Sequence, residues 1–139
     1  MASHPHFGDI PGLEWYTDLE EAKRAAAREG KLLFVEMSRP TCASCRTLFR
    51  ELLPDPDCSD PLRQGFVCVS VDSYDPDPEV VQLGLAHMPY ASMLPVCMYL
   101  TPDGDFLHGS SGRLDKQVFT ADVRYAVNQA QRLAQPAEG

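Results

Sequence analysis

The sequence predicts an α/β fold, a three-layer sandwich in which a central mixed sheet lies between helices. Two observations predict it. Residues 32–35 form a continuous apolar run and residues 66–72 are rich in β-branched side chains, which is typical of strands covered on both faces. Segments with helical periodicity alternate with these strands, as expected for a sheet with helices on both of its faces.

The chain divides into three parts. Residues 1–12 combine proline, glycine and histidine without periodicity, which predicts a flexible N-terminal arm, either mobile or loosely docked. The predicted domain spans residues 13–134, and residues 135–139 form a C-terminal tail. A short edge strand at 13–16 opens the domain.

A helix at about 18–29 follows this edge strand. Thr17 and Glu20 have the spacing of a capping box, and Gly30 is the expected C-terminal cap. The later elements are, in order, a strand at 31–37, a helix from the paired cysteines to Pro54, a helical turn at 60–64, a strand at 66–72, a helix at 79–85, strands at 93–100 and 106–109 joined by a hairpin, and a last helix capped by Asp115.

Size and charge exclude several classes of protein. A chain of 139 residues is long enough to bury a core as one domain, and we expect a monomer. The net charge of −8 opposes binding to nucleic acid, whose phosphates would repel it. No apolar run approaches the roughly 20 residues that span a bilayer, so no membrane association is expected. The first residues do not form a signal peptide, which predicts a cytoplasmic protein as given; a periplasmic or secreted location stays open if the sequence is a mature form.

Two cysteines lie at the junction between the strand at 31–37 and the following helix. Cys42 and Cys45 are three positions apart, and Cys42 lies at the first turn of that helix. Free backbone N–H groups and the helix dipole favour a thiolate over a thiol there. The spacing therefore predicts thiol chemistry. Two core thiols, or half of a metal site, are the alternatives, although no second C-x-x-C or H-x-x-x-H would complete a zinc site.

A C-x-x-C pair in such an α/β order resembles the thioredoxin superfamily. The resemblance spans residues 13–134 and is closest to the stand-alone domains related to the C-terminal domain of thiol:disulfide interchange proteins. It is carried by Trp15, Gly30-Lys31, Cys42-Ala-Ser-Cys45, Leu94-Pro95, Asp103-Gly104 and Gly112.

The resemblance implies roles for individual residues. Cys42 attacks a disulfide and Cys45 resolves the mixed disulfide. Glu36 stands six residues before Cys42, where the family has a buried carboxylate, and it would accept the proton of Cys45. A strand-end carboxylate turned to solvent is the alternative for Glu36. The family also implies that the peptide bond before Pro95 is cis, that the backbone around Leu94 and Pro95 binds the substrate, and that Pro95 keeps metals away from the dithiol.

The residues around the dithiol depart from thioredoxin itself. Thr41 replaces an aromatic neighbour on the surface where a substrate would bind. Ala43 and Ser44 lie between the cysteines, where residue type tunes the reduction potential. Arg46 either acts electrostatically on the acidity of the thiols or is a solvated helix residue.

The other cysteines and histidines receive structural interpretations. Cys58 is expected to be a free surface thiol in a loop. Cys68 and Cys97 are expected in the core, because the family's strand order separates them by roughly 9–10 Å, beyond the ~7 Å limit for a disulfide. His87 is expected as a solvated loop residue unless it reaches the thiols, and His108 as a structural or exposed one.

Together these features predict a thiol–disulfide oxidoreductase that contributes to cell redox homeostasis. It would reduce protein or small-molecule disulfides through Cys42 and Cys45, and an unidentified upstream donor would recharge it. No cofactor is expected beyond the redox-active disulfide that these two residues form. The alternative is a binding or assembly module of the same fold, whose C-x-x-C pair holds a metal such as Cu(I) or is not catalytic.

Overall fold

A computed structural model describes residues 2–10 and 12–135. Its five strands form one sheet in the order β1-β3-β2-β4-β5. The elements are β1 (Trp15–Tyr16), α1 (Leu19–Glu29), β2 (Leu32–Ser38), α2 (Ala43–Thr47), a π-helical turn η1 (Leu48–Leu52), α3 (Pro56–Gly65), β3 (Phe66–Asp72), α4 (Pro78–His87), β4 (Val96–Leu100), β5 (Phe106–Ser111) and α5 (Lys116–Ala134).

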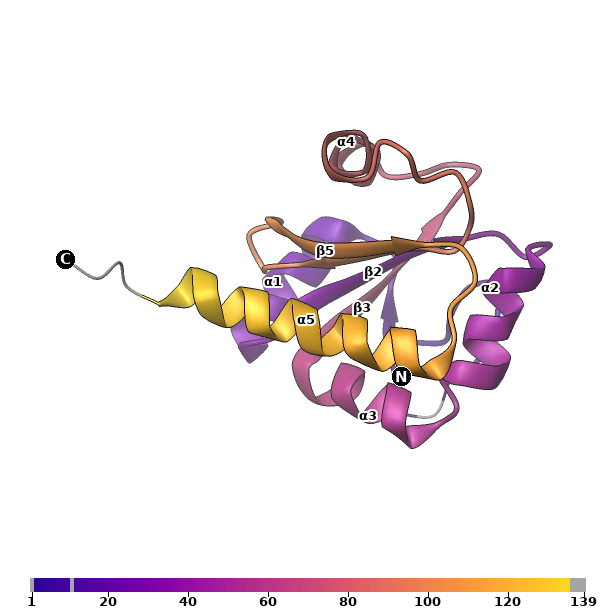
Figure 1. Cartoon of the computed structure of the whole chain (residues 1–139), viewed down its shortest axis with the longest axis horizontal. Coiled ribbons are helices and arrows are strands. Elements are labelled where there is room, and N and C mark those ends of the chain that lie inside the picture. The colour runs from indigo at the N-terminus through magenta and orange to yellow at the C-terminus, as the bar shows by residue number, and fades with distance from the viewer. Residues whose placement is uncertain (1, 11, 136–139) are drawn as a thin grey trace.

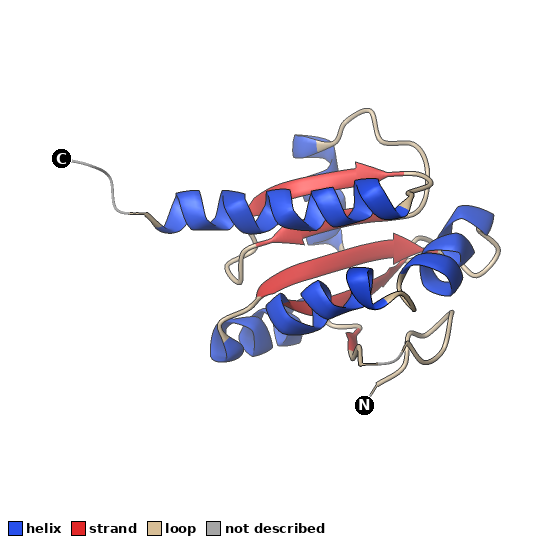
Figure 2. Cartoon of the chain, turned by 60° about the horizontal axis from the view of Figure 1, so that its bottom comes forward, coloured by secondary structure: helices blue, strands red, loops and turns tan. Residues whose placement is uncertain are grey.

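The sheet is mixed, as the sequence predicts. Strands β1, β3 and β2 are parallel, and β4 and β5 are antiparallel to their neighbours. Helices cover both faces, with α1 and α4 on one side and α2, α3 and α5 on the other (Figures 1 and 2). The predicted three-layer α/β sandwich is therefore confirmed.

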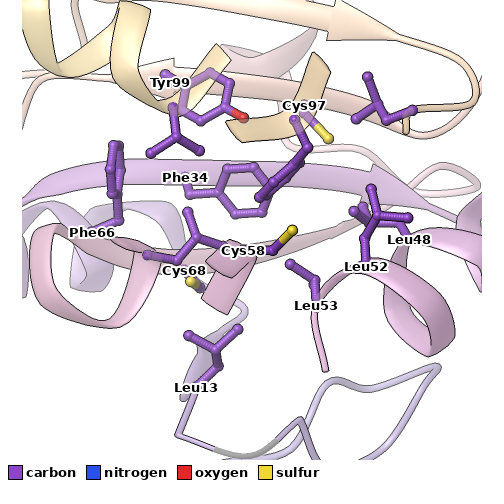
Figure 3. Packing of buried hydrophobic residues seen from close by; sticks show 14 of the residues in the cluster. Leu13, Phe34, Leu48, Leu52, Leu53, Cys58, Phe66, Cys68, Cys97 and Tyr99 are labelled. Atoms are coloured by element: carbon purple, nitrogen blue, oxygen red, sulfur yellow. The ribbon is translucent and has the colours of Figure 1, made fainter. Parts of the chain in front are cut away.

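Side-chain alternation along β2 divides the core into two layers. Leu33 and Val35 face α1, whereas Phe34 packs in the other layer with Cys68 of β3 and Tyr99 of β4. Figure 3 shows this second layer around Phe34. Because successive side chains of a strand point to opposite faces, Glu36 lies on the same face as Phe34, toward the dithiol helix.

The structure corrects several predicted element limits. The N-cap of α1 is Asp18, whose carboxylate accepts from the Glu21 N–H, and not Thr17. Helix α3 is a full helix rather than a turn at 60–64, because Asp55 caps it and Pro56 occupies its first position, where a fixed φ suits helix initiation. Strand β4 begins only at Val96. Helix α4 extends from Pro78 to His87, beyond the predicted 79–85.

The N-terminal arm lies against the domain. His4 and Ile10 are buried, at 1% and 5% exposure. The Trp15 N–H donates to the carbonyl of Ala2, so the arm runs beside the start of β1. The predicted C-terminal tail, residues 135–139, lies outside the described residues except for Gln135. Within the described ranges, no helix is long and apolar enough to cross a membrane.

Candidate active site

The dithiol lies where β2 passes into α2. The chain turns after Ser38, and the Cys42 N–H donates to the carbonyl of Arg39 at 3.2 Å. Cys42 is the N-cap of α2, and its Sγ accepts from the backbone N–H of Cys45 at 3.2 Å. A sulfur at an N-cap stands in for the side-chain oxygen that usually accepts there. The local fold thus directs a backbone N–H at the first sulfur.

The two thiols differ in accessibility. Cys42 is half-buried and Cys45 is fully buried. Burial raises the pKa of Cys45 to about 12, with further contributions from its interaction with the Cys42 thiol and from the negative charge of Glu36. Cys45 therefore stays protonated at neutral pH, while Cys42 is the sulfur that a partner can reach.

Glu36 is fully buried beneath this pair. In the sheet register it lies opposite Ser70 of β3 and Cys97 of β4, on the face that carries Phe34. Burial raises the pKa of the Glu36 carboxyl, and a hydrogen bond from His4 partly opposes that rise. Oε2 has no hydrogen-bond partner among the residues that the structure describes. The prediction of a buried carboxylate rather than a solvated one is confirmed; its catalytic role stays a proposal.

His4 is the site residue that the sequence pattern did not reveal. Its Nε2 lies 3.0 Å from Oε1 of Glu36, and both side chains are fully buried. The segment around it has no periodicity that would indicate burial. The available signal was indirect: a carboxylate inside an apolar strand needs a polar partner, because an unpaired buried charge is costly.

The Leu94–Pro95 peptide bond is cis, as the resemblance implies. Pro95 precedes Val96, which pairs with Met37 of β2, so its loop lies at the sheet edge where the dithiol turn begins. The Gly112 N–H donates to the Pro95 carbonyl at 3.0 Å and ties this loop to the end of β5. Thr41 is exposed beside Cys42 and Leu94 is partly buried. Substrate binding by Thr41, Leu94 and Pro95 stays a prediction.

The three predicted tuning residues are in different environments. Ala43 is exposed and Ser44 is partly buried, both in the first turn of α2. The Arg46 guanidinium donates to the carbonyl of Pro40 at 3.2 Å and so bridges the turn before the dithiol. Tuning of the thiols by these three residues stays a prediction.

Other candidate residues lie away from the dithiol. His87 is exposed at the end of α4 and its ring stacks on Phe106, 4.3 Å between centroids. His108 pairs with Asp122 of α5 at 2.8 Å, which is a structural role. Neither contact involves a site residue.

All five cysteines are free thiols in the structure. Cys68 and Cys97 are core residues on strands separated by β2, as predicted. Cys58 corrects the prediction of a surface thiol: it lies inside α3 at 1% exposure and packs in the layer around Phe34 (Figure 3). The helix that begins at Pro56 turns it inward. Across residues 2–10 and 12–135, no group of three or more His, Cys, Asp or Glu side chains is arranged to hold a metal.

Alkylation of the reduced, folded protein at pH 8 is expected to add one label, at Cys42. The other four thiols are buried, and burial raises the pKa of Cys68, like that of Cys45, to about 12. Only the thiolate reacts appreciably. Intact mass and peptide mapping measure the labels, and a sample unfolded in denaturant, which should take five, is the control. A second rapid label on Cys58 in the folded protein would contradict the burial of the Cys58 side chain in α3.

Known proteins share the fold of this chain. The sequence matches the family model described as thioredoxin-like over residues 14–102. A thioredoxin from Thermus thermophilus superposes with a TM-score of 0.71 at 22% identity, covering 89% of this chain and 94% of its own. A putative disulphide-isomerase from Bacteroides thetaiotaomicron gives 0.67 at 21%, covering 91% and 94%. The DsbD C-terminal domain from Neisseria meningitidis, in the oxidised form, gives a TM-score of 0.54 at 16% identity, covering 77% of this chain and 94% of its own.

No curated protein matches the sequence. The family match covers more than half of the chain, and the fold and the position of the C-x-x-C pair agree with it: this chain belongs to the thioredoxin-like family.

Proposed function

We propose that the chain is a thiol–disulfide oxidoreductase that reduces protein or small-molecule disulfides through Cys42 and Cys45. The observation that carries the proposal is the asymmetry of the pair: an accessible sulfur at a helix N-cap lies three positions before a fully buried one. Exchange chemistry needs this difference, because one thiol must meet the substrate and the other must wait inside the protein.

The reaction proceeds in two steps. The Cys42 thiolate attacks one sulfur of the substrate disulfide, forms a mixed disulfide and releases the first substrate thiolate. Cys45 then loses its proton and attacks the sulfur of Cys42, which releases the second thiolate and leaves a Cys42–Cys45 disulfide. The substrate gains two electrons and the dithiol loses two. An upstream dithiol donor restores the reduced pair, so that no cofactor beyond this couple takes part.

Glu36 is the proposed acceptor of the Cys45 proton. It is buried on the face of β2 toward α2, and its charge influences the pKa of Cys45. Its own pKa is raised by burial, and a base whose pKa approaches the working pH transfers protons most effectively. The exposed Thr41 and the Leu94–Pro95 backbone at the same sheet edge form the proposed substrate surface.

The test is reversible oxidation of the pair during turnover. Reduced protein mixed with a peptide disulfide is expected to lose two hydrogen atoms by mass and to form only the Cys42–Cys45 bond; Cys58, Cys68 and Cys97 should remain alkylatable after unfolding. Dithiothreitol should regenerate the dithiol and sustain turnover. Stoichiometric copper or zinc on protein purified under reducing conditions, together with no disulfide formation, would refute the proposal and favour a metal-holding module.

A further inference from the structure

His4 lies at the centre of an aromatic cluster, and both nitrogens of its ring have polar contacts. Its ring contacts Phe49 of η1 at 4.3 Å between centroids, Trp15 at 4.9 Å and Phe7 at 5.2 Å. Phe49 belongs to the turn that continues the dithiol helix, so this cluster fastens the arm directly beneath the site. An imidazole that is 1% exposed among apolar rings must have its ring nitrogens satisfied.

The hydrogen bonds of His4 assign its tautomer. Nδ1 faces two backbone donors, the N–H groups of His6 at 3.1 Å and Phe7 at 3.3 Å. A nitrogen that accepts these bonds carries no hydrogen, so the ring hydrogen is on Nε2. Nε2–H therefore donates to Oε1 of Glu36, and that oxygen is the acceptor. The turn of the arm, and not Glu36, therefore decides which partner donates in this hydrogen bond.

The two oxygens of Glu36 are thereby made unequal. Oε1 is held by the Nε2–H of His4, while Oε2 is buried and has no partner within the described part of the chain. We propose that His4 is a positioning residue for this acid: it anchors Oε1 and leaves Oε2 as the oxygen that takes the proton of Cys45. This inference rests on the proposed oxidoreductase function. It makes the N-terminal arm part of the site.

The proton balance of the resolving step follows. The S–H bond of Cys45 breaks as an O–H bond forms at Oε2, and the Cys45 sulfur attacks that of Cys42. The departing substrate thiolate is the final proton acceptor, directly or through water, which returns Glu36 to its carboxylate. His4 keeps its single hydrogen on Nε2 throughout, because both backbone donors continue to occupy Nδ1.

Several groups besides His4 act on the Glu36 carboxyl or feel its charge. The titratable ones belong to the arm, to the dithiol helix and to β4, and the hydroxyl of Ser38 belongs to β2. His6 of the arm lies 3.9 Å from Asp72 of β3. The groups that interact with the Glu36 carboxyl are His4, His6, Ser38, Cys45 and Cys97. Among them His4 makes the strongest polar interaction with the carboxyl.

Two substitutions at position 4 test the two ring nitrogens of the imidazole separately. His4→Asn places an acceptor near the position of Nδ1 and removes the donor to Glu36, whereas His4→Gln places a donor near the position of Nε2 and loses the acceptor. His4→Phe keeps the ring among the aromatic side chains and loses both polar contacts. The readout uses the aromatic disulfide dithiobis(nitrobenzoate). Release of its first thionitrobenzoate reports attack by Cys42, and release of the second reports resolution by Cys45.

We expect His4→Asn and His4→Phe to slow the second release about 10-fold near neutral pH, the equivalent of one hydrogen bond to a charged group. The first release should be unchanged, and His4→Gln should resemble the unmodified protein. The acidic limb of the pH profile should move to higher pH in His4→Asn, since loss of the donor disfavours the carboxylate. In a Glu36→Gln background, His4→Asn should have no further effect. Equal slowing by His4→Asn and His4→Gln would overturn the proposal, because His4 would then only fasten the arm.

Two measurements do not depend on turnover. NMR titration of the ¹³C-labelled Glu36 carboxyl should show a higher pKa in His4→Asn than in the unmodified protein or His4→Gln. If that shift occurs while no disulfide exchange is found, the oxidoreductase proposal fails and the His4–Glu36 coupling stands. If the variants do not fold, the ¹⁵N chemical shifts of the His4 ring in the unmodified protein identify its tautomer. A hydrogen on Nε2 is expected, and a hydrogen on Nδ1 would overturn the inference.

Discussion

Cys42→Ala is expected to abolish disulfide exchange, while Cys45→Ala is expected to accumulate mixed disulfides. The half-buried Cys42 is the sulfur that a substrate reaches, and without it no covalent intermediate forms. Cys45 is buried behind it, so its loss permits the first step and blocks the second. Reduction of a disulfide peptide measures the first variant, and non-reducing mass analysis identifies the trapped adduct of the second.

The matched control is Cys58→Ala. This change removes a thiol that is as buried as that of Cys45 but lies in α3, within the core layer around Phe34. It should leave the exchange rate unchanged, so that a loss in Cys42→Ala cannot be assigned to removal of a cysteine as such. Turnover by Cys42→Ala equal to that of the unmodified protein would exclude Cys42 as the nucleophile.

Glu36→Gln is expected to slow the resolving step about 100-fold at neutral pH, the range that a positioned general base supplies. The attack by Cys42 should keep its rate, because Glu36 is proposed to take the proton of Cys45 and not that of Cys42. The two releases of thionitrobenzoate from dithiobis(nitrobenzoate) separate these steps. Glu51→Gln makes the same chemical change on the exposed side of η1 and should alter neither release. Equal slowing of both releases in Glu36→Gln would contradict a role confined to resolution.

The same substitution is expected to raise stability in a pH-dependent way. Burial raises the pKa of Glu36 above its ordinary value of 4.5, so the folded state binds more protons than the unfolded state between those two values. The contribution of the protonated group to the free energy of unfolding is complete below pH 4.5 and is lost as the pH rises through the folded pKa. Gln stays neutral and shows no such loss.

Urea denaturation at pH 4 and pH 8, with reductant present, measures this effect. The advantage of Glu36→Gln over the unmodified protein should be small at the lower pH and larger at the higher one. A difference that is the same at both values would mean that Glu36 has the same pKa in the folded and unfolded states, and would contradict the rise caused by burial.

Local sequence was sufficient for most of the fold. The apolar and β-branched runs of β2 and β3 predicted strands, because a strand covered on both faces needs apolar side chains at every position. Gly30 predicted the end of α1, and it has a φ of 67°, which favours glycine. At the start of α1 the local pattern was insufficient: the capping-box spacing predicted Thr17 as the N-cap, and the structure has Asp18 there.

The sequence by itself also predicted the main residues of the candidate site. The spacing of Cys42 and Cys45 at a strand–helix junction and the position of Glu36 six residues earlier are features of adjacent elements, which short segments encode. The resemblance supplied the cis bond before Pro95, which physical preference alone would have made trans.

Only the tertiary structure decided what surrounds these groups. It turned Cys58 into the core and brought His4 across 32 positions to Glu36. The contact of His4 leaves no periodic signal, since His4 lies in an irregular segment and contacts between distant segments follow from how the chain packs rather than from local preference. The partner of a buried carboxylate is chosen by the three-dimensional fold, which here selects the imidazole of the N-terminal arm.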